Sequence, residues 1–415
     1  MIALAAVVAV LTGDVRLEGQ ASARLETRAR TSTGNDLTST AAGDAEVTPT
    51  LSGSIENLGG RIQLIYSPTF RVREPYYDPR VINPSAPGMA CDKEQIESGA
   101  CITAGRRPEF NQRQTLDMQW SREGKPRLYL LENFYYGRTD LAVQRSTTAA
   151  TFRLGQISEA TIDVNGGIVF PLGRLVSLDT SAGFNYSAGL DRDSIRVLPS
   201  QRAWRTRAKL DAQLSTLDVL SGVVDAQYSA FPGLQSESTI AAAAVRWRRQ
   251  LVRPTAVEVG ALMGVVYGRW VDRPESISPT PGGDATLINR FDLGQHLITF
   301  DFGLRVAPSI DRFVAAAYSR GEVFTNLGWV FRERWSVAGR AGVARSLTAV
   351  RLRAEGTEEQ FFTTFAEVRA GYTAPRYWRV DLSGINSTFV LIGSQNVVNN
   401  WIVSLSLTLH AEGQI

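Results

Sequence analysis

The feature that most constrains the fold is a strict alternation of apolar and polar residues along Trp204–Ala230. In the first arm, one set of alternate positions is mostly apolar and the other is charged or polar: Trp204, Thr206, Ala208, Leu210, Ala212 and Leu214 against Arg205, Arg207, Lys209, Asp211 and Gln213. A turn at 215–218 leads into a second arm with the same alternation. This period of two predicts strands whose faces meet different media. Each arm has about eleven residues, enough to cross a bilayer when tilted, and we expect Trp204 at one end and Tyr228 at the other to lie at the membrane interfaces.

A soluble β-sandwich would alternate too, and three further features favour a membrane barrel. The predicted apolar faces are rich in Ala, Gly and Val and poor in Leu, Ile and Phe. Connections alternate between short and long along the chain. The strand count, about 18, is too large for one water-soluble core. We therefore predict an all-β fold: a single up-and-down antiparallel transmembrane β-barrel of about 18 strands.

The predicted strands follow one another at regular spacing along the chain. They cover 15–31, a hairpin at 47–73 turning at 59–60, 113–122, 126–138, a hairpin at 160–188 turning at 171–174, the hairpin at 204–230, 237–249, 255–271, 297–307, 312–319, 323–332, 335–346, 360–373, 377–391 and 400–411. Loops are expected after residue 31 and at 74–112 and 272–290, and 141–157 is left open between loop and strand. Pro68 requires a bulge or a mismatch in its strand.

The lengths of the connections predict the sidedness of the barrel. Short connections are expected at 59–60, 121–126, 171–174, 215–218, 249–254, 308–311, 332–335 and 374–377, with long ones between them. With both termini in the periplasm, every short turn would be periplasmic and every long loop extracellular. The expected localisation is the outer membrane of a Gram-negative bacterium.

The first residues read as a domain of their own. Met1–Leu11 resembles the hydrophobic part of a secretory signal but lacks a basic leader. We interpret 1–13 as a signal-peptide remnant behind a mis-assigned start, and 14–415 as the barrel. The alternative is that this stretch begins a genuine strand or a short helix.

The two cysteines, Cys91 and Cys101, lie in one Pro-rich segment. A local disulfide fits an oxidising compartment, and two unpaired thiols are the alternative. With no companion Cys or His, the spacing is not a zinc pattern, so we predict no metal site.

The sequence offers little that would support catalysis. It has two histidines, His296 and His410, far apart and both at strand ends, so we interpret them as interfacial or lumenal polar residues. No Gly-x-Ser-x-Gly motif or phosphate-binding glycine loop occurs. A net charge of +3 does not suggest binding of a bulk polyanion such as nucleic acid. We predict no enzyme activity and no cofactor.

The polar face carries the charged residues that would line a lumen. The basic residues proposed to line a path are Arg24, Arg28 and Arg30 on the first strand and Arg205, Arg207 and Lys209 on the eighth. They lie among acidic residues of the same face, including Glu18, Glu26, Asp117, Asp163, Asp211, Asp225, Asp301, Glu367 and Asp381. Two interpretations stay open: a mildly basic, hydrated passage for neutral or anionic solutes, and a cross-strand salt-bridge lattice that only stiffens the barrel.

Two segments resemble a known group of proteins. The hairpin running from Pro49 through Gly60 to Pro68 and the strand Asn111–Trp120 are similar to segments of outer-membrane β-barrels from exopolysaccharide gene clusters, including PEP-CTERM-associated and myxobacterial polysaccharide-export barrels. The resemblance covers most of the chain as a pattern and transfers no functional residue. It implies export of a secreted polysaccharide, with periplasmic polysaccharide-export proteins as partners that would contact the short turns.

The sequence thus predicts an outer-membrane transport barrel, surrounded by lipid, with a polysaccharide as its cargo. A general or solute-specific porin for small polar solutes is the first alternative. A surface adhesin or structural barrel acting through its loops is the second. A gene neighbourhood of glycosyltransferases would favour export over both.

Overall fold

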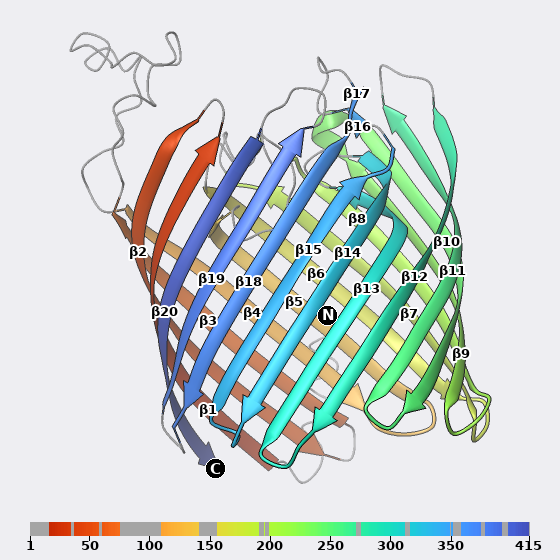
Figure 1. Ribbon diagram of the computed structural model, residues 1–415, viewed down its shortest axis with the longest axis horizontal. Coiled ribbons are helices and arrows are strands. Elements are labelled where there is room, and N and C mark those ends of the chain that lie inside the picture. The colour runs from red at the N-terminus through yellow and green to blue at the C-terminus, as the bar shows by residue number, and fades with distance from the viewer. Residues whose placement is uncertain are drawn as a thin grey trace.

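The protein is an 18-stranded antiparallel barrel closed by pairing of its first and last strands (Figure 1). The computed structural model describes residues 16–34, 37–57, 60–74, 109–140, 156–190, 195, 199–270, 275–311, 316–348, 350–351, 358–374, 378–391 and 397–414. The signal-remnant boundary, Cys91 and Cys101 lie outside the described residues, so the domain boundary and the disulfide remain predictions. No helix in the described part is long and apolar enough to cross a membrane.

The barrel strands follow chain order around the wall. They are β1 Arg16–Gly34, β2 Leu37–Asn57, β3 Gly60–Glu74, β4 Glu109–Arg122, β5 Arg127–Asp140, β6 Gln156–Pro171, β7 Val176–Gly189, β8 Gln201–Gln213, β9 Asp218–Phe231, β10 Ser236–Val252, β11 Thr255–Trp270, β12 Ser276–Asp292, β13 His296–Asp311, β14 Ala316–Phe331, β15 Trp335–Ser346, β18 Phe361–Thr373, β19 Trp378–Leu391 and β20 Val397–Gln414. Between β15 and β18, β16 Val350–Arg351 and β17 Glu358–Glu359 form a separate two-stranded pair. The predicted fold class and strand count are confirmed.

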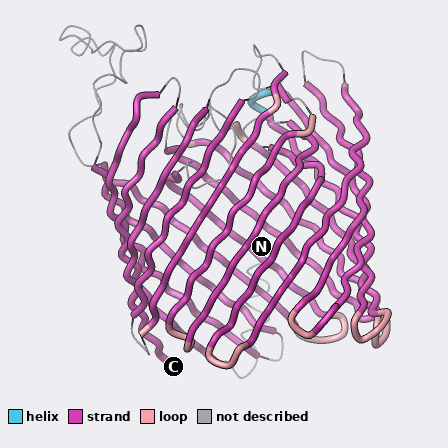
Figure 2. The backbone as a smooth tube through the Cα atoms, viewed as in Figure 1, coloured by secondary structure: helices cyan, strands magenta, loops and turns pink. Residues whose placement is uncertain are grey.

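The two ends of the barrel differ in their connections (Figure 2). Tight turns at 123–126, 172–175, 214–217, 253–254, 293–295 and 332–334 lie at the end where β1 begins and β20 ends; we call this the turn end and the opposite one the loop end. The strict alternation of short and long connections is wrong at the loop end, where several connections are short, among them the one between Asp311 of β13 and Ala316 of β14, which pair. β1 ends at Gly34 and pairs with Leu37, where β2 begins, and the 3-10 turn η2 Pro232–Leu234 joins β9 to β10.

Two errors in the strand prediction cancel in the strand count, because one strand was missed and another was divided in two. The predicted loop at 272–290 contains β12, and the predicted turn at 308–311 lies within β13, so that 312–319 and 323–332 share one strand, β14. Pro279 and Pro281 pair with β11, whereas the register of β12 with β13 begins only at Gly283. Proline lacks an N–H and is tolerated where one side of a strand is unpaired. The prolines of this segment therefore led to the prediction of a loop where the structure has strand β12.

Pro68 produces the predicted mismatch. The β2–β3 register passes from Val47–Phe70 to Leu51–Tyr66 with no pair between them, while Pro68 pairs with Gln114 of β4. Side-chain hydroxyls bridge the gap: Thr48 Oγ1 and Thr69 Oγ1 are 3.1 Å apart, and a matching Thr–Ser contact lies beside them. The barrel wall stays closed where the β2–β3 backbone ladder is interrupted.

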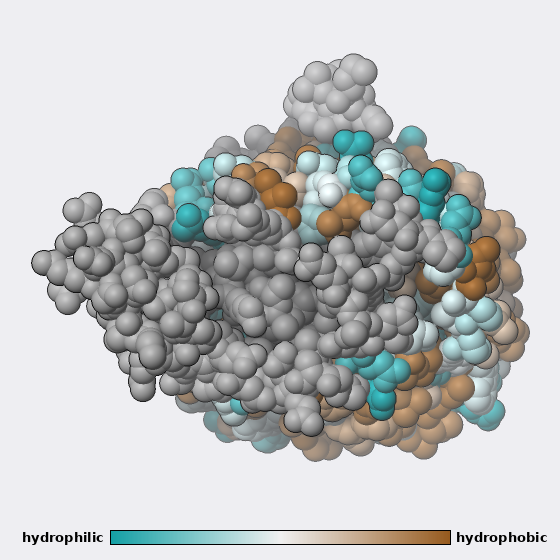
Figure 3. Space-filling model, turned by 90° about the horizontal axis from the view of Figure 1, so that it is seen from above, coloured by the Kyte–Doolittle hydropathy of each residue, from teal (hydrophilic) through white to brown (hydrophobic). Residues whose placement is uncertain are grey.

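The outer face is apolar, as the alternation in the sequence requires. On the central strands Val224 is 58% exposed and Met263 61% exposed, values that suit side chains facing lipid rather than a protein core. Figure 3, which views the barrel from the loop end, shows apolar residues along much of its outer edge. Trp204 and Tyr228 pair directly, with ring centroids 5.6 Å apart, so both lie at the loop end. The expectation of opposite ends is wrong because a hairpin brings its first and last residues together.

A second group of aromatic rings lies at the turn end. The rings of Tyr372 and Trp335 are 4.6 Å apart, and that of Trp378 follows at 5.5 Å from Tyr372. His296, at the turn-end start of β13, stacks on Phe331 with centroids 4.6 Å apart. Two aromatic groups at opposite ends of the outer face match the girdles of a transmembrane barrel.

One acidic residue interrupts the apolar band. Glu132 pairs with Met118 of β4 and Val164 of β6, which puts it in the outer phase of β5. In the described strands it is the charged outer-phase residue farthest from a strand end. The sequence prediction did not single it out.

Candidate functional site

The inner face of the barrel is polar and its side chains contact one another from strand to strand. Asn133 donates a hydrogen bond to Asp117, and Asn185 Nδ2 donates to Asp163 Oδ2 at 3.0 Å. Arg205 Nη2 contacts the same Asp163 oxygen at 2.6 Å. Five consecutive strands, β4 to β8, thus contribute to one polar surface, which identifies the predicted polar face with the lumen wall.

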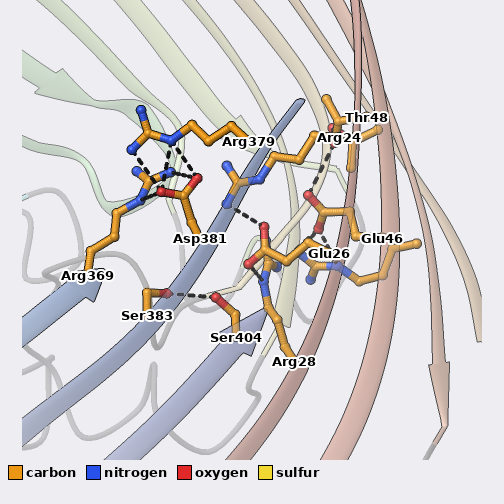
Figure 4. A network of polar contacts seen from close by, with 12 residues as sticks. Arg24, Glu26, Arg28, Glu46, Thr48, Arg369, Arg379, Asp381, Ser383 and Ser404 are labelled. Carbon is orange, nitrogen blue, oxygen red and sulfur yellow. Dashed lines mark hydrogen bonds and ion pairs between the residues drawn. The ribbon is translucent and has the colours of Figure 1, made fainter. Parts of the chain in front are cut away.

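Around the closing seam, this surface is a dense set of ion pairs (Figure 4). On β1, Glu26 accepts from Arg28 Nε at 2.7 Å and pairs with Arg24 Nη2 at 2.8 Å. The Glu26 side chain is 6% exposed and that of Arg28 is 13% exposed, so both are held within the wall. Because Arg24 and Arg28 both contact the Glu26 carboxylate, they hold that side chain in one orientation.

Glu46 on β2 is the centre of the same network. Its carboxylate lies 3.0 Å from Arg28 Nη1, 2.6 Å from Arg71 Nη2 and 3.6 Å from Arg113 Nη2. Its side chain is 4% exposed, so three cations surround one buried anion. We call Arg24, Glu26, Arg28, Glu46, Arg71 and Arg113 the seam lattice.

A related cluster lies on β18 and β19, on the far side of β20. Asp381 Oδ2 is 3.0 Å from Arg369 Nη2 and its Oδ1 is 2.8 Å from Arg379 Nη2. Between this cluster and the lattice, Ser383 and Ser404 share a hydrogen bond of 2.7 Å (Figure 4). The wall around the seam is therefore cross-linked by polar contacts from β18 to β4.

On β8 the predicted basic residues form a different arrangement, which we call the open wall: Arg205, Arg207 and Lys209. Each contacts one carboxylate, at 2.6 Å from Asp163, 3.5 Å from Asp225 and 2.8 Å from Asp211 respectively. Their side chains are 46%, 48% and 34% exposed. Single ion pairs at this exposure hold a side chain only weakly, so these groups remain available to a solute.

The open wall borders a cavity of about 720 Å³ in the lumen, which we call the central cavity. Its inner-face charges are three aspartates and three arginines: Asp117, Asp163, Asp225, Arg205, Arg207 and Arg305. Glu132 also borders the cavity, but its register puts its carboxylate in the outer phase of β5. Carboxamides and hydroxyls fill the spaces between them, among them Gln119, Asn133, Asn165, Ser181 and Gln227. Such a surface offers many donors and acceptors with no net charge.

The structure thus separates the two predicted basic tracks. Arg24 and Arg28 belong to the seam lattice. Arg30 follows them in the same phase of β1, and its side chain lies outside the described residues. Glu46 was missed because the second strand was predicted to begin one residue later, although Glu46 continues its alternation. No group of three or more metal-ligating residues occurs in the part of the chain that the structure describes.

These features define a class of protein. A closed antiparallel barrel with an apolar outer face, aromatic groups at both ends and a charged, hydrated interior is an outer-membrane β-barrel of bacteria. The model of the EpsX exopolysaccharide export family matches residues 151–381, and the chain belongs to this family. The family is one of export and gives no indication of enzyme activity. Its cargo class is polysaccharide, as the sequence resemblance implied.

Solved structures to which this chain is similar include three Occ proteins. OccK7 (OpdD) of Pseudomonas aeruginosa is 11% identical with a TM-score of 0.46, covering 94% of this chain and 99% of its own. OccAB4 of Acinetobacter baumannii is 9% identical with a TM-score of 0.44, covering 95% and 99%. OccK1 (OpdK) of Pseudomonas aeruginosa is 10% identical with a TM-score of 0.42, also covering 95% and 99%. No curated protein sequence matches this chain.

Proposed function

We propose that the barrel is the outer-membrane conduit through which an exopolysaccharide leaves the cell, and that the polymer moves along the open wall. The turn end would face the periplasm and the loop end the outside, as in barrels whose short turns are periplasmic. The observation that carries the proposal is the exposure of the open wall, whose Arg205 and Arg207 line the central cavity and whose Lys209 lines the adjoining lumen cavity at the turn end.

Weakly held donors suit a moving polymer. A sugar hydroxyl or carboxylate can replace one contact of an arginine at a time, so the chain need not lose all of its hydrogen bonds at once. Conduction also requires contacts strong enough for entry and weak enough for release. The central cavity has this balance, because its charges cancel and its carboxamides bind hydroxyls without holding them by charge.

We keep the prediction that the basic residues of β1 face the path, but we propose that they support the barrel wall rather than contact the moving polymer. Arg28 is committed to two carboxylates, whereas Arg24 is 40% exposed toward the lumen. We propose that Arg24, Arg28 and Arg30 shape the wall opposite the moving contacts. Periplasmic polysaccharide-export proteins would dock at the turn end, where turns such as 172–175 and 214–217 present the available surface.

Deletion of the gene, with polymer measured in the medium and in the periplasm, tests the function. Export predicts that secreted polymer is lost and that polymer accumulates inside, with recovery on complementation. A porin predicts normal secretion and reduced uptake of small polar solutes. An adhesin predicts normal secretion and altered attachment, so normal secretion would remove the export proposal.

The path is tested in the complemented strain. The variant Arg205→Gln/Arg207→Gln/Lys209→Gln should lower secretion several-fold while surface level and heat-modifiable mobility stay normal. A matched variant, Arg202→Gln/Arg269→Gln/Arg345→Gln, removes three cations near the loop end, outside the central cavity and away from the turn end, and should secrete normally. Equal secretion by both variants would contradict the path along the open wall.

A further inference from the structure

A second lumen cavity of about 720 Å³ lies at the turn end, which we call the turn-end pocket. The turns at 172–175 and 214–217 and the inner faces of β7 to β11 enclose it. Five cationic side chains line it: Arg174, Arg207, Lys209, Arg246 and Arg248. Arg207 also borders the central cavity, so the two cavities meet along the open wall.

The charge of this pocket is not balanced. Two carboxylates, Asp211 and Glu258, line it beside the five cations, and two more, Asp225 and Asp284, pair with Arg207 and Arg246 from outside the lining, so five cations and four carboxylates leave a net charge of +1. The central cavity, by contrast, has equal numbers of aspartates and arginines on its inner face. The lumen wall therefore changes from cationic at the turn end to neutral in the middle. A concave cationic surface bounded by protein focuses its potential and concentrates anions.

Two of the five cations make no ion pair with a described residue, although one of them, Arg248, lies opposite Glu258 in the β10–β11 register. Lys209 pairs with Asp211 at 2.8 Å and Arg246 with Asp284 at 3.1 Å. Arg174 and Arg248 are exposed and make no ion pair or hydrogen bond with a described residue. An unpaired arginine offers a fork of donors that matches a carboxylate or phosphate. The pocket thus has the chemistry of an anion site that the protein itself leaves unfilled.

We propose that the turn-end pocket binds the acidic groups of the polymer, so that the cargo of this barrel is an acidic exopolysaccharide bearing carboxylate or phosphate groups. The inference rests on the proposed function. The pocket lies inside a lumen, where an extended polymer reaches it and a folded protein does not. Capture at the cationic end, followed by passage into the neutral central cavity, lets binding favour entry without trapping the chain.

Binding of defined oligosaccharides to the purified full-length barrel in detergent micelles tests the proposal. The probes are an oligogalacturonate and a malto-oligosaccharide of equal length, compared by calorimetry at two salt concentrations. We expect the acidic probe to bind with an affinity that falls with salt, and the neutral probe to bind at least about tenfold more weakly, a difference of roughly 1.4 kcal/mol. Equal binding of the two probes, or no binding of the acidic one, would overturn the proposal.

Two double variants test whether the acidic probe binds in the turn-end pocket. Arg174→Gln/Arg248→Gln should weaken binding of the acidic probe about tenfold or more, and neither side chain has an ion pair whose loss would unfold the barrel. The control Arg253→Gln/Arg334→Gln removes two exposed turn arginines that do not line the pocket and should bind as the unaltered protein does. Identical affinities in the two double variants would contradict the assignment.

Composition of the secreted polymer separates the inference from the proposed function. In the deletion and complementation experiment, polymer that depends on this gene should contain uronic acid, acidic substituents or phosphate. A neutral polymer that depends on the gene would leave the export function standing and remove the acidic cargo.

Discussion

The seam lattice and the open wall use the same residue types in opposite ways. Around Glu46, three arginines surround one carboxylate whose side chain is 4% exposed. On β8, each cation has one carboxylate and stays about half or one-third exposed. Both groups lie on the inner face of one barrel. The difference teaches that charge in a lumen becomes structural when several cations share one buried carboxylate, and stays available to a solute when each exposed cation has a carboxylate of its own.

The largest effect expected from this comparison concerns Glu46. Glu46→Gln leaves Arg28 and Arg71 buried without their shared anion, and removing one member of a buried ion pair costs about 3–5 kcal/mol. The free energy of unfolding in lipid vesicles, measured by urea titration, gives the comparison. The matched variant Asp225→Asn, on a side chain 54% exposed, should cost less than about 1 kcal/mol. Similar losses at both sites would mean that the lattice is no more structural than the open wall.

A second prediction tests which face the open wall occupies. Val224 of β9 is 58% exposed in the outer phase and pairs with Ala208, so Val224→Arg would put a cation in lipid. Near the midplane this should destabilise the barrel by about 2–4 kcal/mol in the same urea titration. Gln227→Arg, on the inner face of the same strand, should be tolerated. Equal tolerance of both variants would mean that the inner and outer faces have been exchanged.

A smaller effect concerns Glu132, whose carboxylate belongs to neither the seam lattice nor the open wall. It faces outward between Met118 and Val164, with no ion pair to a described residue. Glu132→Leu should therefore stabilise the barrel in lipid vesicles, by about 1–2 kcal/mol, less than the range for a basic residue at the midplane. Glu132→Gln is the isosteric control and should give a smaller gain. A loss of stability in Glu132→Leu would show that this carboxylate makes a contact needed in the membrane.

The sequence was sufficient to predict which residues of each strand share a face, but it predicted the ends of the strands less well. Period-two alternation put Arg205, Arg207 and Lys209 on one face of their strand, because one residue of slip would reverse every side chain. It missed β12, where Pro279 and Pro281 resemble a loop until the unpaired side of the strand is known. It divided β14 at Gly321, a residue that weakens the strand pattern without ending the strand.

The split between lattice and open wall could not be predicted from the sequence. Glu46 and Arg71 are neighbours only because β2 and β3 pair in one register. Arg113 reaches the same carboxylate from β4. Alternation gives the face of a residue but not its partners across strands, and whether several cations share one buried carboxylate determines whether a lumen charge is held or free.

The most direct test of the central claim is polymer secretion per folded barrel for the two basic tracks. Arg205→Gln/Arg207→Gln/Lys209→Gln and Arg24→Gln/Arg28→Gln/Arg30→Gln would be compared in the deletion strain, with secreted polymer divided by the amount of heat-modifiable barrel at the surface. The account predicts a several-fold fall for the β8 variant. For the β1 variant it predicts less folded barrel but nearly normal secretion per barrel. A fall confined to the β1 variant, or equal values for both, would contradict it.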